Sequence, residues 1–410
     1  MRILYVVPFV PWPVRVRSYN LIPRLAKRHT IDLVSLARSE QEVARLDAIR
    51  PYCASIRTGN FGAAAGVWNA AKALLSPVPL RLAYVASESM KAAVKTAIDA
   101  HRPDVIYVER WRALQYVPGD TGVPIVCDPT DSMALYNRRL MSTGKTWEKI
   151  VGLVEYLKFK HYEPRLTRRV SAAVFCSKID IDFVRSLGHS HNATQIVNGV
   201  DCASFRRKSP AEEGPDELFF SGNFTYRPNQ HAVAFFLKQV FPRIQQQVPG
   251  VRFTVVGNAA KDFLSGALPQ VTGVDAHNFV PSLRPFLARA TVAVAPMTVG
   301  TGVSNKVLEA FSVGTSLVST SLACGDLPVA HGQELLIANR PESFADSVVS
   351  LLRSPEQRAK LANAGADLVS RQYDWEVVAA QMEALLVSVA SRAGDSDVTD
   401  KARTAEFAPF

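Results

Sequence analysis

The chain has 410 residues, of which 48% are hydrophobic and 20% charged, and it carries a net charge of +10. This composition excludes an intrinsically disordered protein, and the length favours two domains, because single cores stop growing near about 250–300 residues. No uninterrupted run of about 18 apolar residues predicts a membrane-spanning helix. The opening segment lacks the pattern of a signal peptide, so we expect a cytoplasmic protein.

Short β-branched runs alternate with longer amphipathic segments in the first half of the chain. The expected strands cover residues 3–9, 31–37, 105–109, 124–128, 172–177 and 194–199. Near-continuous apolar strands separated by helical segments are typical of parallel sheets covered on both faces. We therefore predict a Rossmann-like N-terminal domain over residues 1–208.

A long basic helical stretch is expected at residues 146–169, and core packing explains its apolar side. The first half as a whole is basic: residues 1–208 carry 31 Lys and Arg against 17 Asp and Glu (+14), and residues 209–410 carry 16 against 20 (−4). One interpretation is an anionic acceptor or a peripheral membrane contact, with Trp147 and Trp68 inserting if they face outward. The other is that the charge aids solubility or pairs with acidic groups at a domain interface.

The second half repeats the rhythm after a linker without large apolar side chains at residues 209–217. Its expected strands cover residues 217–222, 252–257, 278–281, 291–297, 316–320 and 334–338. We predict a second Rossmann-like domain over 209–375, a helix over 376–390 that packs back on the N-terminal domain, and a disordered tail over 391–410. The fold class is therefore α/β, with two doubly wound parallel sheets facing a cleft and ligands beyond the strands' carboxyl ends.

The strongest local signal is GTGVSNKVLEAFSVGTSLVST, residues 300–320. Gly302 and its neighbours follow an expected strand and open a helix, so the amides of Val303, Ser304 and Asn305 form an anion site at the helix N-terminus. Lys306 opposes the helix dipole there, which makes sense beside a bound diphosphate. Glu309 shares its helix face and suits ribose hydroxyls. A solvated Lys–Glu pair after a loop remains the alternative.

A second signal, FFSGNFTYRPNQHAV, starts at Phe219 and again runs from a strand into a helix. Gly222, Asn223 and Arg227 line the turn between them, where a ligand would bind. An ordinary strand-to-helix connection explains the same residues.

These segments resemble the retaining glycosyltransferases of family 4, which have the GT-B fold. The matching order is IVNGVDCASF, SGNFTYRPN, FTVVG, NFVPSL, the motif at 300–320 and YDW, over residues 194–375. The resemblance implies that the C-terminal domain binds a nucleotide sugar, with Glu309 on the ribose, Lys306 on the diphosphate and the backbone of Val280 near the base. It also implies a retaining reaction that needs no metal or other cofactor.

Several positions depart from the family pattern. The first glutamate of the family motif falls at Thr301, and the usual Gly-Arg after the first strand of the second domain is Gly222-Asn223, so Arg227 is a substitute for the missing arginine. In the N-terminal loop, Arg15 and Arg17 stand where the family has glycines. They either contact a phosphate or are solvated.

No histidine follows residues 124–128, where the family often has one, and Asp128 and Asp131 occupy that strand end. They orient the acceptor or the donor sugar, or else Asp131 caps the next helix while Asp128 lies in a turn.

The sequence thus predicts a sugar transfer from a nucleotide diphosphate sugar to a glycolipid, exopolysaccharide precursor or natural product. Two other readings stay open: another GT-B enzyme such as a nucleotide-sugar 2-epimerase, and a non-catalytic binding subunit. Nucleic-acid binding has no recognisable motif. The five cysteines, an odd number without a Cys-x-x-Cys pair, predict reduced thiols.

Overall fold

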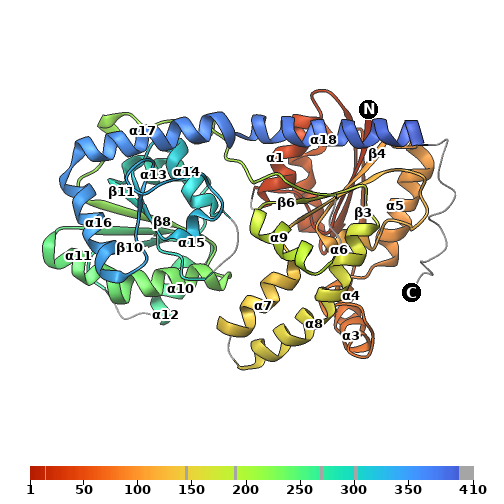
Figure 1. Cartoon of the computed structure of the whole chain (residues 1–410), viewed down its shortest axis with the longest axis horizontal. Coiled ribbons are helices and arrows are strands. Elements are labelled where there is room, and N and C mark those ends of the chain that lie inside the picture. The colour runs from red at the N-terminus through yellow and green to blue at the C-terminus, as the bar shows by residue number, and fades with distance from the viewer. Residues whose placement is uncertain (14, 144–145, 189–191, 268–270, 300–302, 397–410) are drawn as a thin grey trace. The chain divides into compact units, whose positions relative to one another are not determined.

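The computed structural model describes residues 1–13, 15–143, 146–188, 192–267, 271–299 and 303–396. The described chain forms two compact units (Figure 1). The first comprises Met1–Val197 together with the segment from Val378 onward, and the second is Asn198–Val377. Each unit is built around one sheet, in which every pair of described strands is parallel.

The first unit has a seven-stranded sheet with the order β3-β2-β1-β4-β5-β6-β7. Its strands are β1 (Arg2–Val7), β2 (Thr30–Ala37), β3 (Ser55–Asn60), β4 (Val105–Glu109), β5 (Ile125–Thr130), β6 (Ala172–Phe175) and β7 (Ala193–Gln195). The helices between them are α1 (Val16–Leu25), α2 (Glu40–Ala44), η1 (Arg45–Ala48), η2 (Arg50–Tyr52), α3 (Ala63–Ala73), α4 (Leu80–Tyr84), α5 (Glu88–His101), α6 (Trp111–Leu114), α7 (Met133–Thr143), α8 (Thr146–Arg168) and α9 (Lys178–Ser186).

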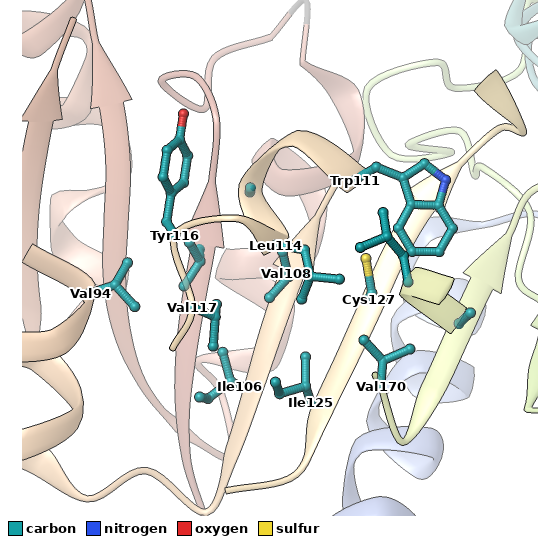
Figure 2. Packing of buried hydrophobic residues seen from close by; sticks show 14 of the residues in the cluster. Val94, Ile106, Val108, Trp111, Leu114, Tyr116, Val117, Ile125, Cys127 and Val170 are labelled. Atoms are coloured by element: carbon teal, nitrogen blue, oxygen red, sulfur yellow. The ribbon is translucent and has the colours of Figure 1, made fainter. Parts of the chain in front are cut away.

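The core of the first unit gathers on the inner strands, which are buried on both faces because helices cover the sheet from two sides. Figure 2 shows side chains of β4 and β5, among them Val108 and Cys127, packed beside Trp111. Tyr116 is fully buried in the same cluster, and its hydroxyl donates a hydrogen bond to the carbonyl of Val85. A buried tyrosine with a satisfied hydroxyl adds a large apolar surface without an unpaired polar atom.

The second unit has a six-stranded sheet with the order β10-β9-β8-β11-β12-β13. Its strands are β8 (Glu217–Ser221), β9 (Arg252–Val256), β10 (Val274–His277), β11 (Val292–Ala295), β12 (Leu317–Ser319) and β13 (Leu336–Ile337). Its helices are η3 (Pro210–Glu212), α10 (Arg227–Phe235), η4 (Phe236–Val240), α11 (Phe241–Gln247), α12 (Ala260–Ala267), α13 (Arg284–Arg289), α14 (Asn305–Val313), α15 (Ser321–Cys324), α16 (Pro341–Arg353) and α17 (Pro355–Gln372). The prediction of two Rossmann-like, doubly wound domains is confirmed.

Two edge strands differ from the sequence prediction. β3 was not predicted, because Ile56 is the only large apolar residue in its sequence SIRTGN. β10 is formed by Val274–His277, whereas residues 278–281, predicted as a strand, come after it. Both strands lie at sheet edges and are only partly buried, so neither has the apolar run that marks an inner strand.

The boundary between the units lies between Val197 and Asn198, earlier than the predicted boundary after residue 208. Ile196 and Val197 accept hydrogen bonds from Arg17 of the first unit. Beyond them, Val200 forms a parallel bridge with Asp374 of the second unit. Residues 196–197 are therefore bonded to the first unit, and Val200 is already bonded to the second.

The predicted linker at 209–217 is a packed part of the second unit. Ser209 and Glu212 form a reciprocal capping box around η3. Glu212 pairs with Arg284, and Glu213 pairs with both Lys208 and Arg358. The polar composition that suggested a flexible connection instead serves capping and ion pairing.

The final described helix, α18 (Trp375–Ser396), is longer than the predicted helix at 376–390. Most of α18 belongs to the first unit, where Glu383 pairs with Arg28 and His29. Residues 391–396, predicted to be disordered, continue this helix. The remaining tail residues, 397–410, lie outside the described residues.

Candidate functional site

In the second sheet, the direction of the strand order reverses between β8 and β11. Ligands of doubly wound sheets bind beyond the carboxyl ends of the strands at such a switch point. β8 ends at Ser221, and the segment after β11 leads into α14, which carries Lys306 and Glu309. The two sequence signals of the second half therefore meet at one place.

The ammonium of Lys306 is held by three side chains at this point. Its Nζ lies 3.1 Å from Ser304 Oγ, 3.3 Å from Asn229 Oδ1 and 3.7 Å from Met297 Sδ. It also lies 5.0 Å from the centre of the Phe220 ring. Among the described residues, no carboxylate forms an ion pair with this ammonium: its direct contacts are neutral, and Glu309 attracts it only at longer range.

Glu309 lies one turn further along α14. Its Oε2 accepts a hydrogen bond from Ser221 Oγ at 3.4 Å, so α14 is tied to the end of β8. Burial raises the pKa of Glu309, and the charge of Lys306 opposes this effect. Burial lowers the pKa of Lys306 to about 8, and Glu309 opposes that shift in turn. Both groups are thus less hydrated than surface side chains.

The turn after β8 is tightly packed around two glycines. A Cβ on Gly222 would lie 2.7 Å from Asn229 Cγ, and one on Gly257 would lie 1.8 Å from the carbonyl oxygen of Gly222. Gly257 also has a φ of +151°. Only glycine lets these two loops approach so closely, and the space this leaves is filled by the Asn229 amide that contacts Lys306.

Of the other predicted residues of this turn, Asn223 orders the backbone through its hydrogen bonds. Asn223 Oδ1 accepts hydrogen bonds from the amide and the hydroxyl of Thr225, and its carbonyl accepts one from Asn229 Nδ2. Arg227 is the first residue of α10 and is partly exposed. Val280 follows β10, which β9 separates from β8, so it lies further along the same carboxyl edge.

The predicted anion site at the start of α14 has fewer available amides than expected. The amide of Ser304 donates to the carbonyl of Ala323 at 3.1 Å. The amides of Asn305 and Lys306 are the first two of the helix and have no carbonyl within the helix to bond. Val303 is described and partly exposed, whereas Thr301 and Gly302 lie outside the described residues.

Sequence reasoning missed Asn229, Met297 and Ser221, which position the two charged side chains. Asn229 is buried on the first turn of α10, and both ends of its amide are hydrogen-bonded. The sequence held no signal for Asn229, because its burial, which requires partners for both polar atoms of the amide, follows only from the folded structure. Met297 and Ser221 gave none, since both end ordinary apolar strand runs.

In the first unit, Arg17 and Asp128 are both buried and form an ion pair. Arg17 also donates to the carbonyls of Ile196 and Val197, and Tyr107 donates its hydroxyl to Asp128. These groups saturate one another in the interior. The predictions that Arg17 contacts a phosphate and that Asp128 orients a substrate are therefore wrong, and so is the alternative that Asp128 lies in a turn, because it belongs to β5.

Asp131 lies beyond β5 and pairs with Arg110 at 3.3 Å. It does not cap α7, because Ser132 Oγ accepts the amide of Leu135 and thus fills the capping position. The side chain of Asp131 is one-third exposed, so it remains available at the carboxyl edge of the sheet.

Arginines gather around the switch point of the first sheet, between β1 and β4. Arg15 follows β1 and lies over the Phe9 ring, while Arg110 and Arg112 follow β4. Burial lowers the pKa of Arg112 to about 10, and the charges of Arg110 and Arg15 add to this effect. Among the described residues, neither Arg15 nor Arg112 forms an ion pair, although Glu109 and Glu42 attract Arg15 at longer range. Carboxylates therefore balance only part of the positive charge at this edge.

Glu109 is the last residue of β4 and precedes Arg110. The sequence did not predict it as a site residue. It is buried, and Tyr5 donates its hydroxyl to it at 3.4 Å. Burial raises the pKa of Glu109 to about 7; Asp128 adds to the shift, whereas Arg110 and Arg17 oppose it. A carboxyl group that titrates near neutral pH at a switch point suits acid–base or hydrogen-bond chemistry.

The described residues contain no group of three His, Cys, Asp or Glu side chains that would hold a metal ion. The Asp-x-Asp sequence at 180–182 lies on α9, where Asp180 accepts the amide of Ser132 and Asp182 pairs with Arg185. All five cysteines are free thiols. Within the part of the chain that is described, no helix has the length and hydropathy needed to cross a bilayer.

The two parallel-sheet units have the fold of solved GT-B glycosyltransferases. Residues 215–354 match the family of "Glycosyl transferases group 1", and this range covers the switch point between β8 and β11. HepE of Anabaena, solved in complex with UDP-glucose, superposes with a TM-score of 0.68, covering 95% of this chain and 100% of that one at 14% identity. At this identity the likeness shows the fold alone.

Two curated relatives extend the comparison. A phosphatidyl-myo-inositol mannosyltransferase of Mycobacterium tuberculosis is 27% identical over 215 residues, 48% of this chain and 55% of that protein. An uncharacterized protein in the cps region of Klebsiella pneumoniae is 21% identical over 252 residues, 60% of this chain and 63% of that protein. The chain thus spans less than two thirds of the length of either relative.

Proposed function

We propose that this protein is a retaining glycosyltransferase that moves a sugar from a nucleotide diphosphate sugar to an acceptor. The observation that carries the proposal is the ammonium of Lys306, which neutral side chains hold at the switch point of the second sheet without a carboxylate partner among the described residues. A diphosphate would supply the ion-pair partner that this ammonium lacks. The match to group 1 glycosyltransferases over the same residues supports the assignment.

The donor would bind with its diphosphate at Lys306 and the amides that open α14, and with its ribose at Glu309. During transfer, the bond from the anomeric carbon to the diphosphate oxygen breaks, and the acceptor oxygen bonds to the same carbon on the same face. The proton of the acceptor passes to the departing diphosphate. Lys306 stabilises the charge that grows on the leaving group, which is the main means of catalysis in such a reaction.

We also propose that the acceptor is anionic and that its charged group binds at Arg15 and Arg112. The electrostatic argument is that these two arginines, near the switch point between β1 and β4, form no ion pair among the described residues. Asp131, which is one-third exposed, would lie beside this group, where its carboxylate can hold an acceptor hydroxyl. The name of the mycobacterial relative, which specifies a phosphatidyl-myo-inositol substrate, supports an acceptor of this charge class.

The first experiment measures transfer from UDP-glucose and a panel of other nucleotide sugars, with and without exhaustive chelation. We expect turnover that persists in the chelator, because no metal takes part in the proposed mechanism. We also expect a product that retains the anomeric configuration of the donor, because the acceptor bonds on the face from which the diphosphate leaves. If the chelator abolished activity and added magnesium restored it, metal independence would be contradicted. Thermal stabilisation by a nucleotide sugar with no turnover on any acceptor would instead favour the non-catalytic binding subunit.

Exchange of Arg112 for glutamine tests the acceptor assignment. With phosphatidylinositol as the anionic probe, Arg112→Gln is expected to raise the acceptor KM about tenfold, the size of one lost charge-assisted hydrogen bond. The donor KM and the KM for uncharged diacylglycerol stay unchanged. Arg50→Gln, which alters an exposed arginine paired with Asp47, is the matched control. An equal KM change for both lipids would remove Arg112 from the anion site.

We further propose a cytoplasmic location, since five free thiols suit a reducing compartment.

A further inference from the structure

From Thr146 to Leu157, the helix α8 has its polarity reversed relative to an ordinary surface helix, whereas further along Phe159 and Leu166 pack in the core. The buried residues of α8 also include Glu148, Glu155 and Glu163. Its exposed residues include large apolar side chains at helical spacing: Trp147, Ile150, Val151, Leu153 and Leu157. The expectation that core packing explains the apolar side of this helix is therefore wrong.

Two of the buried glutamates accept hydrogen bonds that explain why they are buried. Glu163 accepts hydrogen bonds from Ser132 Oγ and from the amides of Met133 and Ala134, and it thereby caps α7. Glu155 accepts the amide of Arg81. Since these contacts fix the carboxylate side of α8 against the protein, the apolar side must face outward.

A second exposed apolar segment lies against α8. Lys158 Nζ donates to the carbonyls of Ala73, Ser76 and Val78, which joins the middle of α8 to the end of α3 and the loop after it (Figure 1). This segment exposes Val67, Trp68, Leu74 and Leu75, of which Leu75 is 99% exposed. We call the exposed apolar residues of 67–75 and 147–157 together the apolar face.

The exposed charged side chains of the two segments that form the apolar face are all positive. Lys72 lies 5.1 Å from the Trp68 ring and, like Lys149, is exposed. Further along α8, Arg165 and Arg168 are exposed as well. The structure describes every residue of 63–76 and 146–168. In these two ranges, the only carboxylates are the three buried glutamates.

We propose that the apolar face docks on an anionic membrane surface, with Trp68 and Trp147 inserted at the level of the lipid headgroups. Exposed tryptophans and aliphatic side chains flanked by lysine and arginine, without accessible carboxylates, match the chemistry of an anionic bilayer. A protein partner would have to supply acidic groups around an apolar centre, and a second copy of this chain would bring the same basic rim against itself.

The test is co-sedimentation of the full chain with vesicles of phosphatidylcholine alone and of phosphatidylcholine with phosphatidylglycerol. We expect binding to the anionic vesicles that falls steeply as salt is raised, because exposed charges are screened over about 8 Å at physiological ionic strength. The variant with Trp68→Ser, Leu75→Ser, Trp147→Ser and Ile150→Ser should lose at least tenfold in partition. Ile179→Ser, at an exposed isoleucine of the same unit outside the apolar face, should bind as the wild type does.

The four substituted side chains are exposed, so the variant should fold, and its melting temperature checks this. Brominated lipids should quench tryptophan emission in the wild type but not in the fourfold variant. The proposal is overturned if the wild type ignores anionic vesicles at low salt, or if the fourfold variant binds them equally well. A dimer in solution that the fourfold variant abolishes would assign the apolar face to a second copy instead.

Discussion

Replacing Lys306 by alanine should reduce sugar transfer by a factor of about 10²–10³ while the fold survives. The loss of one group that stabilises charge on a leaving group costs about 2.7–4 kcal/mol of barrier. The fold should tolerate the change, because the ammonium is costly to bury and its partners are neutral side chains. Steady-state kinetics with a saturating donor, together with a melting curve, measure both parts of the expectation.

Matched variants separate the role of Lys306 from a general loss of charge. Lys360→Ala removes an exposed lysine of the same unit and should leave turnover unchanged. Glu309→Gln should act mainly by weakening nucleoside diphosphate binding. Full activity in a folded Lys306→Ala protein would show that the diphosphate is bound elsewhere.

The lowered pKa of Lys306 adds a pH signature. Because the folded-state pKa is about 8, the charged form that binds a diphosphate is lost as pH rises through 8. In the wild type, kcat/KM should therefore fall on the alkaline side with an apparent pKa near this value. Lys306→Arg should move that limb to higher pH, since a guanidinium stays charged there.

Replacing Asp128 by alanine should destabilise the protein by about 3–5 kcal/mol, the cost of leaving a buried charge unpaired. The charge that remains is the guanidinium of Arg17, which is buried beside Tyr107 and Cys176. Chemical denaturation measures the loss. Asp131→Ala, which removes a partly exposed carboxylate three residues later, is the control and should cost less than about 1 kcal/mol, because exposed ion pairs contribute little.

If Asp128→Ala were as stable as the wild type, Arg17 would have to reach water or another anion, and the buried ion pair would not hold the fold. A double variant, Asp128→Ala with Arg17→Met, extends the test. Removing both charges should recover part of the lost stability.

The sequence predicted the inner strands of both sheets because strands such as Val105–Glu109 are buried on both faces and so form nearly continuous apolar runs. It predicted Lys306 and Glu309 because their spacing on one helix follows from helical geometry alone. It did not predict Asn229 or Ser221, because their partners come from elements far along the chain. It misplaced Arg17 and Asp128, since an arginine in a loop and an aspartate after a strand have the same local pattern whether they bind a ligand or each other.

The position of α18 has a consequence for the order in which the protein folds during synthesis. Val378, Met382 and Leu386 are fully buried, and Glu383 pairs with Arg28 and His29 at the other end of the sequence. The first unit to leave the ribosome thus lacks a covering segment until the whole of Asn198–Val377 has been made. The second unit is continuous in sequence and is completed earlier, so the usual order of N-terminal domain first does not hold here. Nascent chains stalled before residue 378 should expose an apolar surface on the first unit, which is the surface a chaperone would recognise.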